Sequence, residues 1–123
     1  MAPGADKPAL SRRFHEAVEL IGARWTGAIL HVLMTGTVRY AELRAAVPEI
    51  SDRMLCERLR MLEDAGIIVR TVSAPPPVRV DYELTGKGRA LQPALDAIAA
   101  WAEQWVTIPD TFDSATPRPV KRR

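Results

Sequence analysis

The chain has 123 residues, 47% of them hydrophobic, and a formal net charge of +2, which suits one compact domain with one core. Its only cysteine, Cys56, excludes an intramolecular disulfide framework and has no Cys or His partner at metal-ligand spacing, so we expect no metal and no cofactor. Residues 1–106 hold 13 of the 17 basic groups and 13 of the 15 acidic groups and are neutral. The net charge therefore does not indicate a nucleic-acid partner by itself.

The two ends differ in composition from the middle of the chain. Residues 1–9 are rich in Pro and Ala and predict a loose N-terminus, whereas residues 107–123 combine prolines with a basic cluster and predict a flexible basic tail. Residues 10–106 form the expected domain. There is no apolar run of about 18 residues and no apolar stretch typical of a secretory signal, so we expect a cytoplasmic protein without membrane contact.

Apolar residues at helical spacing predict three helices in the first half of the domain. The first ends at Gly22, the second spans residues 24–36, and the third is short, beginning near Tyr40 and stopping at Pro48. A short extended piece is expected at residues 37–39, between the second helix and the third.

A fourth helix is expected from Ser51, a good N-cap residue, to about Ala65, with Gly66 as its stop. Its apolar residues fall on one face, which predicts that this face packs on the core. The other face carries polar and charged residues and is expected to be exposed: Ser51, Asp52, Arg53, Cys56, Glu57 and Arg60.

The second half of the domain predicts a β-hairpin and a last helix. Residues 67–72 and 78–84 are rich in β-branched residues, and the tip between them, residues 73–77, contains three prolines. In the second strand the inward residues are expected to be Val78, Val80, Tyr82 and Leu84. Thr85 is expected to cap one long helix, whose apolar stripe consists of Leu91, Leu95, Ile98, Ala102 and Trp105.

This order of elements is typical of a winged helix-turn-helix, an α+β fold that is mainly α. Such a fold places the start of its recognition helix against base edges in the major groove, and we assign that role to the helix beginning at Ser51. Arg53 suits a guanine edge and Glu57 a cytosine amino group, whereas Ser51 suits a phosphate. Contacts to the DNA backbone or minor groove are expected from Arg39, Tyr40, Arg70 and Arg79.

An alternative remains open for the two arginines of the hairpin. Arg70 and Arg79 are also placed to pair with Asp81 or Glu83 across the strands.

Five stretches resemble the HxlR-type regulators, bacterial relatives of the MarR winged-helix group. They are LIGARW at 20–25, RYAEL at 39–43, ISDRML at 50–55, RLRMLEDAG at 58–66 and VDYELTGKG at 80–88, and the resemblance spans about residues 10–105. It implies a transcriptional regulator that binds double-stranded operator DNA as a homodimer. It also implies that residues 73–77 form the wing and that the N- and C-terminal helices mediate dimerisation.

The tryptophans of the last helix agree with a dimer, because they offer more apolar surface than so small a domain easily covers. The expected interface residues are Phe14, Val18, Leu95, Ile98, Trp101 and Trp105. The alternative is that Trp101 and Trp105 pack on Phe14 and Trp25 within the same chain.

The sequence gives weaker signals for regulation by a ligand or by thiol chemistry than for DNA binding. Trp25 and Met34 are candidates for a small-molecule effector pocket, although such residues at helical spacing are more often core. Many members of the family carry an oxidant-sensing cysteine near the start of the first helix, where this chain reads SRRF at 11–14. Cys56 stands instead on the expected recognition helix, and we hypothesise that modification of its thiol releases DNA.

The sequence also bears on two other classes of function, an enzyme and a protein-interaction module. An enzyme is disfavoured because the sequence has no Gly-rich phosphate loop, no HExxH and no nucleophile elbow. The alternative is a winged-helix protein-interaction module without specific DNA binding, which predicts an acidic or apolar recognition face. Arg53, Arg58 and Arg60 argue against that alternative.

Overall fold

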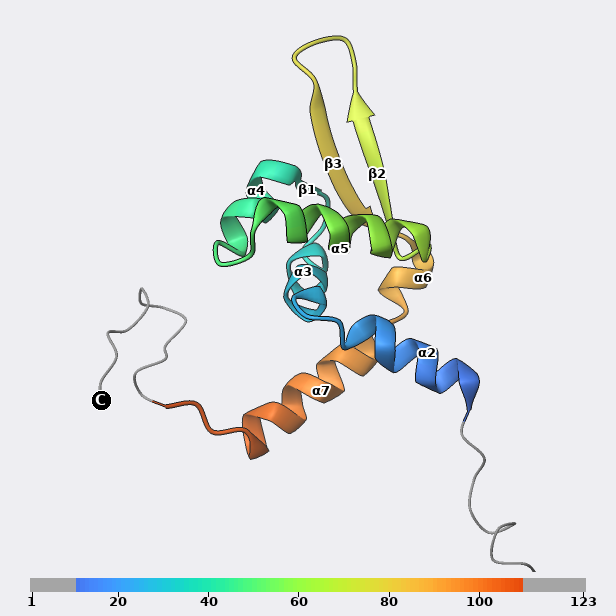
Figure 1. Cartoon of the computed structure of the whole chain (residues 1–123), viewed down its shortest axis with the longest axis vertical. Coiled ribbons are helices and arrows are strands. Elements are labelled where there is room, and N and C mark those ends of the chain that lie inside the picture. The colour runs from blue at the N-terminus through green and yellow to red at the C-terminus, as the bar shows by residue number, and fades with distance from the viewer. Residues whose placement is uncertain (1–10, 110–123) are drawn as a thin grey trace, which may run out of the picture. The chain divides into compact units, whose positions relative to one another are not determined.

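A computed structural model describes residues 11–109, and the chain divides into two units, Met1–Ala90 and Leu91–Arg123 (Figure 1). Between Leu91 and residue 109, where the description ends, the second unit contains one helix, α7 (Gln92–Trp105). Residues 1–10 and 110–123, which include most of the two expected tails, lie outside the described residues. The described elements of the first unit are α2 (Arg12–Ile21), α3 (Thr26–Leu33), β1 (Val38–Arg39), α4 (Tyr40–Ala46), α5 (Asp52–Asp64), β2 (Ile68–Ser73), β3 (Arg79–Leu84) and α6 (Gly86–Arg89). This order confirms the predicted winged helix-turn-helix.

The helix α5 is held by its apolar face, as the sequence predicts. Leu55, Leu59 and Leu62 are all buried, and burying a leucine side chain stabilises a fold by about 1.5–3 kcal/mol. Other core side chains come from α3, α4, the turn before α5 and the strands: Ile29, Leu30, Leu33, Leu43, Ile50, Ile68, Tyr82 and Leu84. The opposite face of α5 consequently points to solvent.

Both ends of α5 are fixed by local hydrogen bonds. The Ser51 Oγ accepts the backbone N–H of Met54 at 3.1 Å, so Ser51 is the N-cap as predicted. Beyond the other end, Gly66 has φ +76°, a left-handed conformation that glycine adopts without strain. The Lys87 Nζ donates to the carbonyl of Ala65, at the negative end of the helix dipole.

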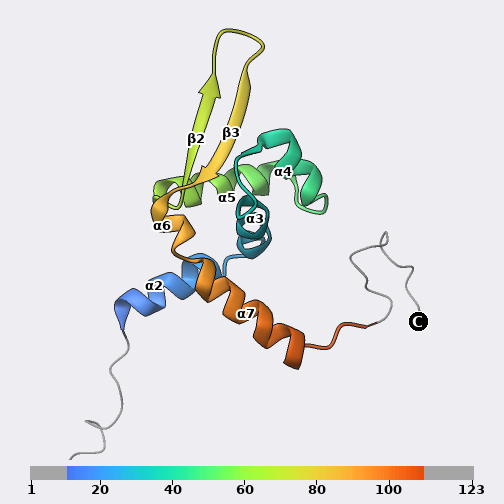
Figure 2. The same ribbon diagram turned by 180° about the vertical axis from the view of Figure 1, so that it is seen from behind.

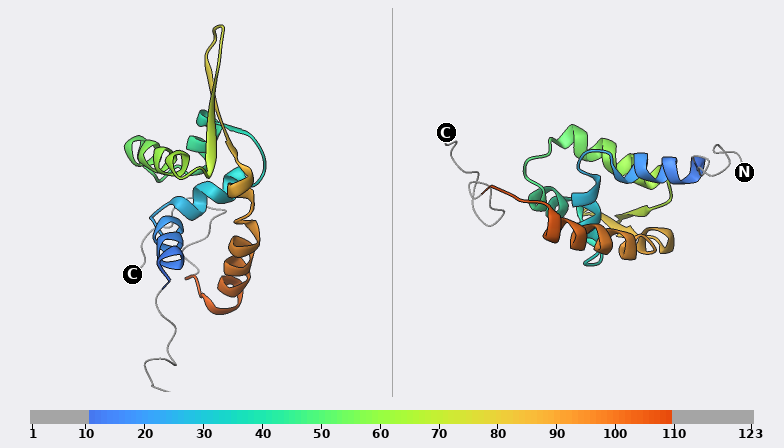
Figure 3. Two further views of the ribbon diagram at one scale, coloured as in Figure 1. Left: turned by 90° about the vertical axis from the view of Figure 1, so that its right-hand side faces the viewer. Right: turned by 90° about the horizontal axis from the view of Figure 1, so that it is seen from below.

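The three strands form one antiparallel sheet in the order β1-β3-β2. Pairs run from Ile68 with Leu84 to Ser73 with Arg79, so β2 and β3 form a hairpin joined by residues 74–78. We call residues 74–78 the hairpin loop. The two opposite views in Figures 1 and 2 show the hairpin reaching away from α3, and Figure 3 shows it edge-on. The predicted hairpin is thus confirmed.

Two details of the prediction are wrong. Val78 was expected to face inward, but it lies in the hairpin loop and is 61% exposed, because pairing begins only at Arg79. Thr85 was expected to cap one long helix, but it caps the four-residue α6, and a second helix, α7, begins at Gln92. Pro93 explains the break, since a proline in a continuous helix lacks an N–H and clashes with the carbonyl four residues earlier.

The junction between β3 and α6 contains a close backbone approach that predicts a measurable stability effect. A Cβ on Gly88 would collide with the carbonyl oxygen of Ile67, whereas a Cβ on Gly86 would meet nothing within 4 Å. We expect Gly88→Ala to lower the free energy of unfolding by about 2 kcal/mol, and the control Gly86→Ala to change it by less than about 0.5 kcal/mol. Urea denaturation of both variants checks this, and equal midpoints would contradict it.

Helix α7 has no buried residue, although it carries the apolar stripe of the second unit. Ile98, Trp101 and Trp105 are 55%, 60% and 65% exposed. Among the described residues, no helix is long and apolar enough to span a membrane.

Candidate nucleic-acid interface

The exposed face of α5 begins at its N-terminus, where the side chain of Arg53 projects into solvent. The Arg53 side chain is 88% exposed, and its Nε lies 3.4 Å from the Glu57 carboxylate, one helical turn further on. An exposed pair of this kind contributes well under 1 kcal/mol, so it leaves both side chains available to another partner. The structure therefore agrees with the expected exposure of Arg53 and Glu57.

Asp52, by contrast, is already engaged by α4. The Arg44 Nε donates to Asp52 Oδ1 at 2.6 Å, and the Nη1 of the same side chain donates to the carbonyl of Val47 at 3.3 Å. These bonds link α4, the turn and the start of α5. Asp52 thus helps to orient the helix-turn-helix, although its side chain remains 75% exposed. Sequence reasoning missed Arg44, whose only signal is its position eight residues before an aspartate, across a proline turn.

Tyr40 connects the start of α4 to the exposed face of α5. Its hydroxyl donates to Asp52 Oδ1 at 3.4 Å and lies 3.8 Å from the Cys56 Sγ. Burial, followed by the neighbouring Cys56 and Asp52, raises the pKa of Tyr40 to about 12. The phenol is therefore protonated at neutral pH and remains a hydrogen-bond donor.

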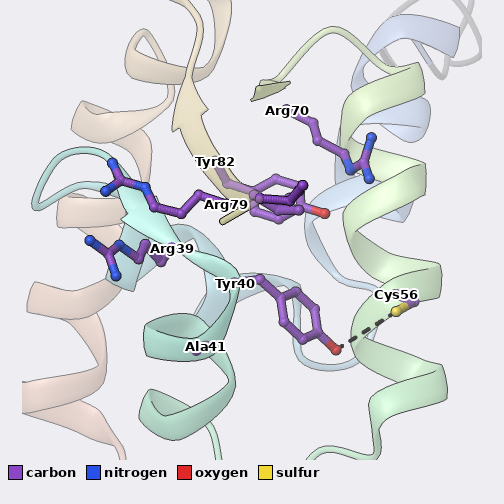
Figure 4. Close-up of a pocket in the computed structure, with 9 residues that line it drawn as sticks. Arg39, Tyr40, Ala41, Cys56, Arg70, Arg79 and Tyr82 are labelled. Carbon is purple, nitrogen blue, oxygen red and sulfur yellow. Dashed lines mark hydrogen bonds between the residues drawn. The ribbon is translucent and has the colours of Figure 1, made fainter. Parts of the chain in front are cut away.

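A cavity of about 470 Å³ lies between these helices and the hairpin. Figure 4 shows Arg39 and Arg79 on one side of it, Arg70 on the other side near α5, and Tyr40 and Tyr82 between them. Its lining comes from the end of β1, the start of α4, the exposed face of α5 and both strands of the hairpin: Arg39, Tyr40, Ala41, Cys56, Arg70, Val78, Arg79, Val80 and Tyr82. Five of the predicted DNA-contacting residues thus surround one space.

Three arginines line the cavity, and one carboxylate, that of Asp81, lies close to Arg79. Arg79 Nη2 lies 3.6 Å from Asp81 Oδ2, two residues further along the same strand, so this weak ion pair does not run across the hairpin. Arg70 forms no ion pair with the described residues, and Glu83 pairs instead with Arg89 at 3.4 Å. Burial raises the pKa of Tyr82, and the guanidinium of Arg70 partly offsets this.

The other arginines of α5 differ in role. The Arg58 Nε donates to the backbone carbonyl of Arg24 at 2.8 Å, so this residue ties α5 to the segment before α3. Arg58 therefore does not support a basic recognition face as the sequence argument assumed. Arg60 and Cys56 are exposed on α5, as predicted.

The residues expected at a dimer interface are largely exposed within the chain. Phe14 is 66% and Val18 48% exposed on α2, and the Ile98, Trp101 and Trp105 side chains of α7 are exposed to a similar degree. Leu95 is half-buried. More than half of the surface of four of these residues is accordingly available for a partner, and less than half for Val18 and Leu95.

The two candidates for an effector pocket lie apart. Trp25 precedes α3 and Met34 follows it, and a helix of eight residues is about 12 Å long. Trp25 has φ +76°, a strained conformation for a residue with a side chain, and the Arg24 guanidinium lies 5.1 Å from its ring centroid. The structure does not bring Trp25 and Met34 together at one site.

The sequence of this chain matches a known protein family and several named regulators. The profile of the HxlR-like helix-turn-helix family matches residues 20–109. The HTH-type transcriptional regulator YvaP of Bacillus subtilis (strain 168) is 44% identical over 94 residues, 76% of this chain and 87% of YvaP. YodB, an HTH-type transcriptional regulator of the same strain, is 44% identical over 99 residues, 80% of this chain and 88% of YodB.

Solved structures agree with the sequence comparison. The reduced form of YodB from B. subtilis matches with a TM-score of 0.74 and 42% identity, over 83% of this chain and 100% of that chain. Its quinone-bound form matches with a TM-score of 0.70, over 78% of this chain and 100% of that chain. The chain therefore belongs to the HxlR-like helix-turn-helix family and is a DNA-binding transcriptional regulator.

Proposed function

We propose that the chain binds operator DNA as a homodimer, with the N-terminal half of α5 in the major groove and the hairpin on the neighbouring backbone and minor groove. One observation carries the proposal: Cys56, on the exposed face of α5, lines the same cavity as Arg39, Arg70 and Arg79. The face that reads bases is thus continuous with a group of cations. We also propose that the protein acts in the cytoplasm and has no catalytic activity of its own.

Base recognition falls to Arg53 and Glu57, because both project from the first turns of α5 with only a weak ion pair between them. A guanidinium donates two hydrogen bonds to O6 and N7 of guanine, and a carboxylate accepts from the amino group of cytosine. Ser51 and Arg60 flank these residues on the same helix and are proposed to contact the backbone. Asp52 acts indirectly, through its bond to Arg44.

We assign phosphate binding to the arginines that line the cavity. The backbone strand that separates a major groove from the adjacent minor groove passes between a recognition helix and its wing. Arg39, Arg70 and Arg79 line the space in which such a phosphate would lie. These contacts position the protein without reading the sequence.

The homodimer is proposed from the exposed apolar residues of α2 and α7. A large exposed apolar surface on a small protein marks an interaction site, and the commonest partner is a second copy related by a two-fold axis. Two recognition helices then meet two half-sites about one helical turn apart.

A small-molecule effector is a separate proposal. It is supported by the quinone-bound form of YodB and by the strained backbone at Trp25, and it concerns Trp25 rather than Met34 because the two lie at opposite ends of α3.

Selection from a pool of random duplexes tests the proposed function. The purified 123-residue chain should enrich one palindromic site whose half-sites are centred about 10 base pairs apart. A pool without an enriched sequence would contradict the proposal and favour a winged-helix module that binds protein.

Alkylation of Cys56 tests the position of α5 on the DNA. Iodoacetamide adds a carbamidomethyl group to this exposed thiol, beside the cavity, and we expect the affinity for the selected operator to fall about tenfold because the added bulk meets the DNA. Cys56→Ser treated in the same way is the control and should be unaffected. Unchanged affinity after complete alkylation, confirmed by mass spectrometry, would refute this prediction.

A further inference from the structure

The hairpin loop has an unusual composition for a segment expected to meet DNA. Residues 74–78 read Ala-Pro-Pro-Pro-Val and contain no charge, and all five are exposed. The three prolines have no backbone N–H. The centre of the loop therefore cannot donate a hydrogen bond to a phosphate or a base edge, and all of its side chains are apolar.

The loop begins where the cavity ends. Val78 belongs to the loop and also lines the cavity beside Arg79, which pairs with Ser73 in the last rung of the hairpin. Ser73 lies three residues beyond Arg70, or about 10 Å along an extended strand. Figure 3 shows the loop at the far end of the hairpin. The loop thus lies within reach of any DNA whose phosphate occupies the cavity.

The minor groove is the occupant that this geometry favours. Backbone phosphates border this groove, so a segment extending beyond a phosphate-bound Arg79 lies at its edge. A loop without a cation gains nothing from the phosphates on either side. Apolar side chains, proline among them, instead act in minor grooves as wedges that separate stacked bases.

The sequence preference of such a wedge follows from its lack of charge. A-tracts are stiff and have a narrow, strongly negative minor groove that attracts arginine. An uncharged loop with three proline rings does not benefit from that potential and needs a wider groove. Pyrimidine–purine steps such as TA and CA/TG open and kink easily.

We propose that the hairpin loop is an uncharged apolar wedge that enters the minor groove beside the phosphate held in the cavity and selects flexible base steps against A-tracts. The inference rests on the proposed function and deepens it, because it names a second, shape-dependent source of specificity. The wedge acts at positions outside those read by α5.

The test compares two duplexes that share the selected half-sites and differ only at the position facing the loop, one with a TA step and one with an A-tract. The native chain should bind the first about tenfold more tightly, comparable with the effect of one unfavourable base pair. In a loop variant, Pro75→Gly with Pro76→Ser and Pro77→Gly, this ratio should fall below about twofold, while the preference for the half-sites remains. Equal affinity of the native chain for both duplexes would overturn the proposal.

A second variant gives the opposite result. Pro76→Arg supplies a cation to the loop, so it should favour the A-tract duplex and steepen the salt dependence of binding by roughly one per phosphate newly contacted. A Pro76→Arg chain that keeps the native preference would also overturn the proposal. If the native chain enriches no half-site, both the wedge and the proposed function fail, whereas an enriched half-site with no preference at the loop position contradicts the wedge alone.

Discussion

Trp101→Asp should convert a dimer into monomers and weaken binding to the selected operator by about 100-fold or more. Trp101 is 60% exposed on α7, next to Ile98 and Trp105 on the same face, and a carboxylate buried at a two-fold interface would be unpaired. Once the subunits separate, each half-site is bound independently and the avidity of the linked pair, typically 100- to 10,000-fold, is lost. Analytical ultracentrifugation and fluorescence anisotropy measure the two effects.

The matched control for this variant is Ala100→Asp, which adds the same charge to α7. Ala100 lies about 160° around the helix from Ile98, away from the apolar face. It should leave both the mass of the particle and the affinity unchanged. A native chain that sediments as a monomer, or a Trp101→Asp chain that remains dimeric, would contradict the proposed interface.

Removing two cations from the cavity should have the second largest effect. In Arg39→Ala with Arg70→Ala each subunit loses two phosphate contacts, so the slope of log K against log salt should fall by roughly 0.9 per contact, about four units for a dimer. The affinities for the operator and for an unrelated duplex should fall in parallel, because phosphate contacts carry no sequence information.

Arg89→Ala is the control for the cavity variant, since Arg89 pairs with Glu83 and does not line the cavity. Its salt slope should equal that of the native chain. If the double variant kept the native slope, the phosphates would have to be bound elsewhere on the protein.

Helix α5 and the hairpin could be predicted from the sequence because their signals are local. Ser51 and Gly66 mark the ends of α5, and three leucines at helical spacing mark its buried face. The hairpin follows from two β-branched runs around a proline cluster. Pro93 marked the break between α6 and α7 just as locally, but the apolar stripe on both sides of it suggested one helix.

The cavity could not be predicted as a site, because it forms only when distant segments meet. Arg39, Arg70 and Arg79 come from three strands, and pairing of β3 with both β1 and β2 brings them together. The roles of Asp52 and Arg58 also depend on partners in other elements, Arg44 and the carbonyl of Arg24. Periodicity identifies these side chains as polar and exposed but does not show which of them are already paired.

The central claim is that α5 reads DNA sequence, and fluorescence anisotropy with Arg53→Ala tests it most directly. The native chain and the variant are titrated across a salt series into the selected operator and into a scrambled duplex of equal length. We expect tight, salt-sensitive binding that prefers the operator, and a loss of about 1–3 kcal/mol in the variant for the operator but not for the scrambled duplex. Equal binding of both duplexes by the native chain, or a variant with native preference, would contradict the account.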